Sequence, residues 1–199
     1  MIAAMRMTRA ERRAQTRDEL VQAAAHVFGE QGFHSARLDD VAERAGYSTG
    51  AIYSNFSGKE DLFLAVLEWQ VAAHVRDLRA AVEPESDPER RVAAAAMQWL
   101  DEQRRGQRAF LLFVELWAYA ARSPRFRRSF VQRVRALREA SAALIAEADV
   151  PLKLPPEELA VIANALTNGM ALERRIDPAA VPDDLYGKAL GLLLAGARL

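Results

Sequence analysis

The side chains best suited to contact another molecule gather in one short stretch near the beginning of the chain. They are hydroxyl and carboxamide groups with one glycine among them, at Ser48, Thr49, Gly50, Tyr53, Ser54 and Asn55. Hydroxyl groups and the free backbone amides at the beginning of a helix hydrogen-bond phosphate oxygens, and glycine allows a close approach. The stretch therefore has the chemistry of a surface that binds a phosphate backbone, although few of its side chains suit bidentate reading of bases.

The residues needed for most other chemistries are missing or scattered. The chain has no cysteine, so it offers no thiolate nucleophile, no thiolate metal site and no disulfide. His26, His34 and His74 have no partner at a metal-ligand spacing, and there is no glycine-rich phosphate loop. An enzyme is the weakest hypothesis for this chain, and neither a cofactor nor a metal is predicted.

Two short helices are predicted to position the polar stretch. Apolar residues that indicate one helix face recur at three- and four-residue steps, at Leu38, Val41, Ala42 and Ala45. Gly46 can end this helix with a positive φ, and Ser48 can accept a hydrogen bond from the first amides of the next. Ile52 and Phe56 are expected to face inward. Two short helices about one glycine turn make a helix-turn-helix, whose second helix fits a DNA major groove.

Several fixed spacings in this region agree with one known pattern. They are Asp40-Val41-Ala42, the run from Ala45 to Tyr53, Asn55-Phe56, and Lys59-Glu60-Asp61-Leu62. The stretch of roughly residues 12 to 65 resembles the DNA-binding domain of TetR-family transcriptional regulators. The resemblance implies an all-α protein, with an N-terminal three-helix DNA-binding domain followed by a larger helical domain for ligand binding and dimerisation.

Arginine at position 37 departs from the family pattern. The family usually has Thr or Ser there, whose hydroxyl caps the first short helix, and an arginine is unable to accept that hydrogen bond. Either Ser35 caps the helix in another way, or Arg37 contacts phosphate. Arg44 and Lys59 are also predicted to contact phosphate, Lys59 because it stands at the beginning of a long helix.

Charge is distributed unevenly along a chain that is neutral in total, with 27 basic and 27 acidic residues. The first 17 residues hold five arginines and one glutamate. Beside a helix-turn-helix, such a basic arm is expected to touch phosphates or the minor groove, although a solubilising tail explains it about equally well by itself.

Length and composition favour a helical protein of more than one domain. Hydrophobic residues make up 51% of the 199 residues, and alanine and leucine dominate over β-branched types. Periodicity and capping signals predict about nine helices. They divide into a DNA-binding domain (1–57), a connecting helix (58–82) and an effector-binding and dimerisation domain (83–199). No run is long enough for a membrane span, so a cytoplasmic protein is expected.

Apolar and aromatic residues in the predicted central helices could line a cavity for a small-molecule effector. Those proposed to contact it, with three polar residues among them, are Met97, Trp99, Phe110, Phe113, Glu115, Trp117, Asn164 and Asn168. A filled helical core explains each aromatic residue at least as well. For Glu115 a salt bridge with an arginine is the favoured alternative, and the two asparagines fit a dimer interface equally well.

The last two predicted helices carry wide apolar faces that suit a four-helix interface between two subunits. The residues predicted to form it are Leu159, Ile162, Ala163, Leu166, Met170, Leu185, Ala189, Leu192 and Leu193. A homodimer would place two reading helices about 34–36 Å apart, the spacing of successive major grooves on a palindromic operator. The alternative is that these residues complete the core of one subunit.

The functional hypothesis is a repressor that an apolar or amphipathic ligand releases from double-stranded operator DNA. The ligand would shift the long helix that begins near Ser57 and move the two reading helices off groove spacing. The alternative is a helical sensor or interaction dimer without DNA binding, for which the neutral total charge and Arg37 leave room.

Overall fold

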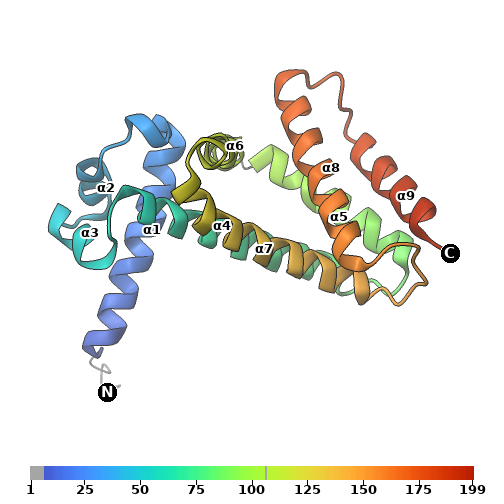
Figure 1. The fold of residues 1–199 in the computed structure, drawn as a ribbon, viewed down its shortest axis with the longest axis horizontal. Helices are drawn as coiled ribbons and strands as arrows, with labels where there is room; N and C mark the ends of the chain where they lie inside the picture. The colour runs from blue at the N-terminus through green and yellow to red at the C-terminus, as the bar shows by residue number, and fades with distance from the viewer. Residues whose placement is uncertain (1–6, 106) are drawn as a thin grey trace, which may run out of the picture. The chain divides into compact units, whose positions relative to one another are not determined.

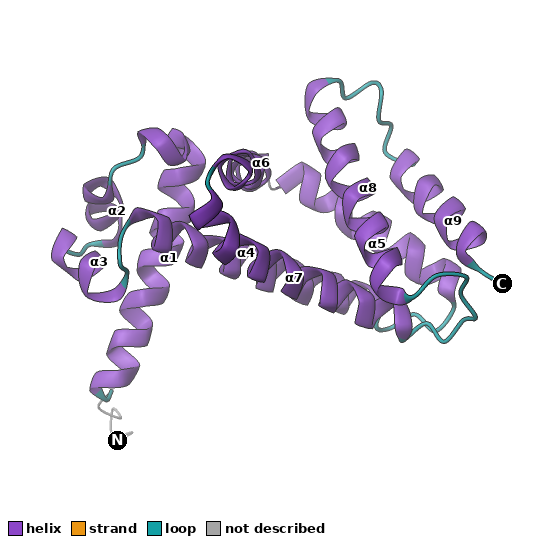
Figure 2. Cartoon of the chain, in the orientation of Figure 1, coloured by secondary structure: helices purple, strands orange, loops and turns teal. Residues whose placement is uncertain are grey.

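The computed structural model describes residues 7–105 and 107–199, and within them it contains nine α-helices and no strand (Figure 1). The helices are α1 (Arg9–Ser35), α2 (Leu38–Ala45), α3 (Thr49–Asn55), α4 (Lys59–Val82), α5 (Pro88–Arg105), α6 (Gln107–Arg122), α7 (Pro124–Ala146), α8 (Pro156–Ile176) and α9 (Leu185–Ala197). Figure 2 shows that loops join helix to helix throughout, with the longest ones before α8 and before α9. The all-α prediction is confirmed.

By its internal contacts the chain divides into two compact units. Unit 1 comprises Met1–Gln70 and Leu111–Ser129, and unit 2 comprises Val71–Phe110 and Phe130–Leu199. The division therefore falls inside α4, α6 and α7 rather than in loops. The predicted borders after residues 57 and 82 separate functions rather than groups of contacts, and they stay predictions.

The beginnings of two helices show how local sequence sets the elements. At α1, the Thr8 hydroxyl accepts from the Glu11 amide and the Glu11 carboxylate accepts from the Thr8 amide, a capping box. At α4 the sequence also predicts a capping box between Ser57 and Glu60, and the structure shows a different partner for Ser57. The Ser57 amide donates to Asp61 Oδ2 at 2.9 Å instead, because the helix begins two residues later than Ser57.

Two glycines with positive φ shape unit 1. Gly32 interrupts the helical geometry near the end of α1 with a φ of 76°. Gly46 ends α2 with a φ of 72°, and the next amide, that of Tyr47, donates to the Ala42 carbonyl at 2.9 Å. Gly46 therefore provides the tight turn of the helix-turn-helix that the sequence predicts.

The core of unit 1 is a cluster of phenylalanines. Phe33 stacks on Phe63 with ring centroids 4.2 Å apart, and Phe28 meets Phe63 edge-on at 5.0 Å. Ile52 of α3 and Val41 of α2 are completely buried in the same unit. Packing against α1 and against each other gives the two short helices a support that they would lack alone, since helices of this length are marginal in water.

The core of unit 2 centres on Trp99 of α5 and Tyr186 of α9, whose rings lie 4.3 Å apart. Ala171 of α8 and Val181 of the loop before α9 complete the buried cluster. Arg174 holds that loop by donating to the Val181 carbonyl at 2.6 Å. The three helices α5, α8 and α9 therefore share one buried core in this unit.

The loop before α8 pairs with the residues after α9. Lys153 donates its amide to the Ala197 carbonyl at 2.7 Å, and Leu199 donates to the Pro151 carbonyl at 3.1 Å. Between them, Leu152 and Arg198 form an isolated antiparallel bridge. This pairing holds two segments together that are far apart in the sequence.

Replacing Gly46 with alanine should lower the free energy of unfolding by about 1 kcal/mol, because a Cβ disfavours the left-handed backbone there. Space is not the cause, since nothing lies within 4 Å of a Cβ added at this position. Urea denaturation measures the change. Gly50→Ala is the matched control: it lies inside α3 without a positive φ, so alanine should be neutral or stabilising there. Equal losses in both variants would contradict this account.

Candidate nucleic-acid interface and ligand pocket

Helix α3 has one buried side and one exposed side. Ile52 is completely buried and Phe56, the residue that ends the helix, is 3% exposed, as the sequence predicts. On the other side, the Tyr53 ring is 63% exposed and Ser54 is also exposed. The polar side of α3 is therefore free to meet a duplex.

Two arginines of α1 hold the end of α3. Arg13 donates to the Ser54 carbonyl at 3.1 Å, and Arg17 donates to the Asn55 carbonyl at 3.0 Å. The Arg17 guanidinium also lies 4.3 Å from the centre of the Phe56 ring. The prediction of a flexible basic arm is therefore wrong for residues 9–17, which are helical; its Arg6 lies outside the described residues. The four-residue spacing of the two arginines was the signal that they share a helix face.

Asn55 lies at the same end of α3. Its side-chain nitrogen donates to the Ala51 carbonyl at 2.8 Å, and this half-buried carboxamide thereby closes the last turn of the helix. Its phosphate-binding role stays a prediction, since its side-chain nitrogen bonds only to the neighbouring Ala51 and Ser54.

Arg37, Asp39 and Thr49 form a polar network between α2 and α3. Asp39 accepts from the Thr49 hydroxyl at 2.7 Å and from the exposed Arg37 guanidinium at 3.3 Å. The Thr49 hydrogen bond, followed by that of Arg37, lowers the pKa of the Asp39 carboxyl. Arg37 occupies the N-cap position of α2 but no side chain caps this helix, so the alternative in which Ser35 does so is wrong.

The residue at the beginning of α3 also differs from expectation. Ser48 takes the N-cap position, but its hydroxyl makes no capping hydrogen bond. Gly50 is the second residue of the helix, where a Cβ would lie 3.6 Å from the Ser48 hydroxyl oxygen. The predicted hydrogen bond from a backbone amide of α3 to the Ser48 hydroxyl is therefore not formed.

Arg44 and Lys59 are partly engaged by neighbours. Arg44 lies 3.8 Å from the Glu30 carboxylate, with both side chains well exposed. Lys59 donates to the His34 carbonyl at 3.0 Å and lies 4.9 Å from the centre of the Phe33 ring. Burial lowers the pKa of Lys59, against the opposing charge of a nearby glutamate. Lys59 therefore ties the beginning of α4 to the end of α1.

Glu115 closes the break in α1 rather than facing a ligand. Its carboxylate accepts from the Phe33 amide at 2.9 Å, the first amide after Gly32. A Cβ on Gly32 would lie 3.4 Å from both carboxylate oxygens. A second residue of α6, Tyr119, donates to the Glu60 carboxylate and packs its ring 5.3 Å from that of Phe33. Neither the predicted ligand contact nor the predicted arginine salt bridge is the observed role of Glu115.

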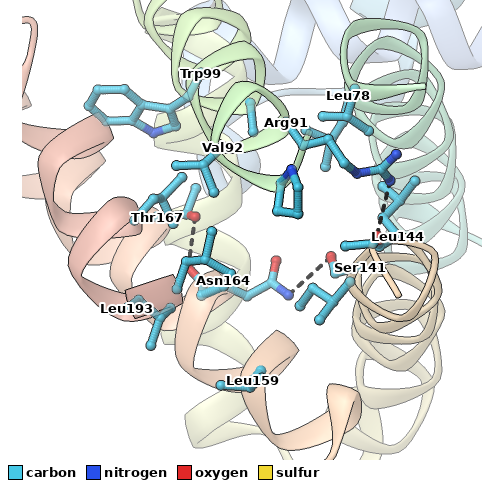
Figure 3. Close-up of a pocket in the computed structure, with 18 of the residues that line it drawn as sticks. Leu78, Arg91, Val92, Trp99, Ser141, Leu144, Leu159, Asn164, Thr167 and Leu193 are labelled. Atoms are coloured by element: carbon cyan, nitrogen blue, oxygen red, sulfur yellow. Dashed lines mark hydrogen bonds between the residues drawn. The ribbon is translucent and has the colours of Figure 1, made fainter. Parts of the chain in front are cut away.

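Unit 2 contains a mostly apolar pocket of about 200 Å³ (Figure 3). Its lining comes from α4, α5, α7, α8 and α9 and from the loop before α8. Of the residues predicted to contact a ligand, Trp99 and Asn164 line it. Sequence reasoning missed the polar lining residues His74, Arg91, Gln98, Ser141, Thr167 and Tyr186, because nothing in their local spacing connects five separate helices.

The other predicted ligand residues lie elsewhere. Met97 is 72% exposed, because it falls on the outer side of α5. Phe110 packs against the core around Trp99, and Asn168 is half-buried outside the pocket lining. Phe113 and Trp117 belong to unit 1, where their rings lie 5.9 Å apart. None of these five positions lines the pocket, and neither does Glu115, so their ligand contacts stay predictions.

Hydrogen bonds fix the polar side chains of the pocket. The Thr167 hydroxyl donates to the Ala163 carbonyl at 2.8 Å, so its 2.7 Å contact with Tyr186 has the tyrosine as donor. Burial raises the pKa of Tyr186 to about 12. Arg91 is largely buried and donates to the carbonyls of Glu85 and Leu144. The pocket is therefore polar at a few held points and apolar between them.

His74 enters the pocket lining from α4 and pairs with Glu102 of α5 at 2.8 Å. Burial by itself would lower the pKa of His74. The hydrogen bond and charge of Glu102, with a smaller contribution from Asp77, outweigh burial and raise it. The pair therefore favours a charged imidazolium beside the cavity.

The predicted dimer residues divide between interior and surface. Six face inward, either into the pocket or into the core, and their place in a dimer interface stays a prediction: Leu159, Ala163, Leu166, Met170, Leu185 and Leu193. Ile162 and Leu192 are 42% and 76% exposed, while Ala189 is half-buried. The exposed face also carries Val161, Leu172 and Ile176. Periodicity did not separate the two sides, because α8 and α9 are apolar around most of their circumference.

Metal-binding clusters and membrane-spanning helices are both absent from the described residues. Among residues 7–105 and 107–199, no group of three or more histidines and acids is arranged to hold a metal ion. Within the same described part of the chain, no helix combines the length and apolar character needed to cross a bilayer.

The helix α3, with one exposed polar side, is joined to α2 by a glycine turn and braced by α1, and this arrangement defines a helix-turn-helix protein of the DNA-binding class. Comparisons with known families give the same class. Residues 20–66 match the family described as bacterial regulatory proteins, tetR family, and residues 88–195 match the BetI-type transcriptional repressor, C-terminal. The chain belongs to the TetR family of transcriptional regulators.

Individual relatives agree with this assignment. The chain is 40% identical over 96 residues to the HTH-type transcriptional activator FasR of Mycolicibacterium smegmatis, covering 48% of this chain and 42% of FasR. It spans about half the length of the curated relatives it matches. The matched proteins are regulators and not enzymes, which confirms that prediction.

Solved structures share the fold along most of the chain. A transcriptional regulator from Rhodococcus sp. Rha1 is 28% identical with a TM-score of 0.71, covering 92% of this chain and 98% of its own. A regulator from Saccharomonospora viridis in complex with choline has a TM-score of 0.71, with 92% and 96% covered. It is only 19% identical and shows the fold alone.

The raised pKa of His74 makes a pH dependence of stability testable. The stabilisation should be fully present below the unfolded value of about 6.5 and should disappear as the pH rises through the higher folded pKa. Urea denaturation of wild type and His74→Gln should therefore show a difference in unfolding free energy that shrinks from about pH 5.5 to about pH 9. The exposed His26→Gln is the control. A difference that grows with pH would contradict the assigned role.

Proposed function

We propose that this protein is a repressor that binds a palindromic operator as a homodimer and leaves it when a small molecule enters the pocket of unit 2. The observation that carries the proposal is the exposed polar side of α3, with Tyr53 outermost, on a helix whose other side is buried. The BetI-type match supports repression, whereas FasR, an activator, shows that the family also holds the opposite outcome.

The DNA contacts are proposed residue by residue. Tyr53 and Ser54 project from α3 toward the groove or the backbone, and Ser48, Thr49 and Gly50 meet phosphate at its beginning. Exposed Arg37 and Arg44 are proposed as phosphate contacts. Since Arg37 pairs with Asp39 in the free protein, DNA binding would exchange this weak surface ion pair for a phosphate. Asn55 and Lys59 have structural partners and are secondary candidates.

The pocket is proposed as the effector site. Helix α4 begins at Lys59 in unit 1 and lines the pocket with His74, Leu78 and Val82 in unit 2. A ligand that favours one position of this helix would thereby bias the reading unit. Moving an equilibrium from about 99% to about 1% occupancy requires a preference of about 10⁴-fold, or ~5.5 kcal/mol.

The second subunit is proposed to cover the exposed apolar face of α8 and α9. This face includes Val161, Ile162, Leu172 and Ile176 of α8 and Leu192 of α9. Exposed apolar patches of this kind mark protein interfaces, and a dimer would join two reading helices on one operator.

A mobility-shift assay with DNA from upstream of the protein's own gene tests DNA binding. Affinity should fall steeply as salt rises. Arg37→Gln should weaken binding and reduce the salt slope by about one, since it removes one phosphate contact. Arg125→Gln, an exposed arginine of α7, is the matched control and should leave both unchanged.

The alternative, an interaction dimer without DNA binding, gives the opposite outcome. A folded dimer that produces no retarded band even at low salt would contradict the proposal of DNA binding and support the interaction dimer. Expression of a reporter under the bound promoter separates repression from activation, because loss of Arg37 should raise expression only for a repressor.

Placing a charge on the exposed apolar face should abolish dimerisation. Leu192→Glu puts a carboxylate where a partner subunit would bury it, so the variant should sediment as a monomer and lose DNA affinity. Met97→Glu is the control, since Met97 is comparably exposed but lies on α5. A Leu192→Glu protein that remains dimeric would place the interface elsewhere.

A further inference from the structure

The pocket of unit 2 has a charge pattern that restricts what it can bind. No aspartate or glutamate lines it, and its two basic side chains already have partners. His74 is paired with Glu102, and Arg91 donates to two backbone carbonyls and lies 3.7 Å from the Glu147 carboxylate. A buried cation would find no counter-ion there, and an anion would compete with bonds that are already made.

The aromatic residues of the lining do not form a cage for a cation. Trp99 and Tyr186 are the aromatic side chains that line the pocket, and they pack against each other at 4.3 Å with an interplanar angle of 31°. Both are almost completely buried in the core of unit 2. A quaternary ammonium group would therefore lack both the acid and the open ring faces that such ligands need.

Asn164 has a fixed orientation in the pocket. Its side-chain nitrogen donates to the Ala160 carbonyl at 2.7 Å and to the Ser141 hydroxyl at 3.2 Å. A carbonyl only accepts, so the amide nitrogen must face Ala160, and this settles which way the carboxamide is turned. Both N–H groups are used.

The buried indole Nε1 of Trp99 has no partner among the described residues, and the Asn164 carbonyl oxygen is a second polar atom left over. It makes no hydrogen bond within the described residues. Figure 3 shows the Asn164 side chain in the middle of the lining residues, with its nitrogen toward Ser141 and its oxygen turned away from that bond. The neighbouring hydroxyl pair of Thr167 and Tyr186 has both hydrogens committed, so it also presents only acceptors.

We propose that the effector is an uncharged apolar molecule with a hydroxyl group, which donates its hydrogen to the side-chain oxygen of Asn164. This inference rests on the proposed function of the pocket as the effector site. The apolar lining binds the hydrocarbon part, and Asn164 selects for the donor. A ligand of the same shape without the donor would leave the Asn164 oxygen buried and unpaired.

The test is a calorimetric titration of the full-length dimer with matched probes in the absence of DNA. 1-Octanol and its isomer 1-methoxyheptane have the same heavy atoms and similar shape, but only the alcohol donates a hydrogen bond. Wild type should bind the alcohol about threefold to tenfold more tightly than the ether. Octanoate and choline, an anion and a quaternary ammonium, should both bind more weakly than the alcohol.

Two variants test whether the Asn164 side chain causes the difference in affinity between the alcohol and the ether. Asn164→Leu should remove the preference of alcohol over ether, and Asn168→Leu, one turn further along α8 and outside the lining, should retain it. The comparison of the two probes on wild type needs no variant, so the proposal stays testable if Asn164→Leu does not fold. Equal binding of alcohol and ether, or tighter binding of choline or octanoate, would overturn it.

A mobility-shift assay with the same probes separates this inference from the proposed function. Alcohol that binds with the expected preference but does not release DNA contradicts ligand-induced release and leaves the ligand class standing. DNA binding that persists while no probe binds to the protein contradicts the ligand class alone.

Discussion

Burial of one side of α3 is the constraint on which the reading surface depends. Ile52 and Phe56 are buried, and Arg17 of α1 lies over the Phe56 ring and donates to the Asn55 carbonyl at the end of the helix. A seven-residue helix has too few internal hydrogen bonds to persist by itself. The side that faces outward is therefore set by what faces inward. Tyr53 is exposed because Ile52 and Phe56 place the opposite side of α3 in the core.

Sequence patterns predicted the helices well where local chemistry decides them. The Thr8–Glu11 capping box, the positive φ of Gly46 and the inward Ile52 all follow from residues a few positions apart. Side-chain partners across the chain were not predictable in this way. Glu115 closes a break 82 positions earlier, at Phe33, and no periodicity within α6 signals such a contact.

The helices around the pocket illustrate the same limit. In α8 and α9 apolar residues cover nearly every side. The pattern therefore predicts burial but does not indicate which part of the protein each residue contacts. The structure resolves this: Leu159 and Leu193 face the cavity, while Ile162 and Leu192 face outward. Polar residues were harder still. Asn164 was predicted to contact a ligand or to lie in a dimer interface, but its orientation depends on Ser141, a residue of α7.

The pairing of the loop before α8 with the residues after α9 has a consequence for how such a regulator diversifies. Leu152 and Ala197 both line the cavity, and the Leu152–Arg198 bridge fixes their distance from each other. Substitutions in these two surface segments can reshape the cavity wall without altering any residue of α1, α2 or α3. Under the proposed function, ligand preference would change at these pocket residues while the DNA-contacting residues of α2 and α3 stay the same.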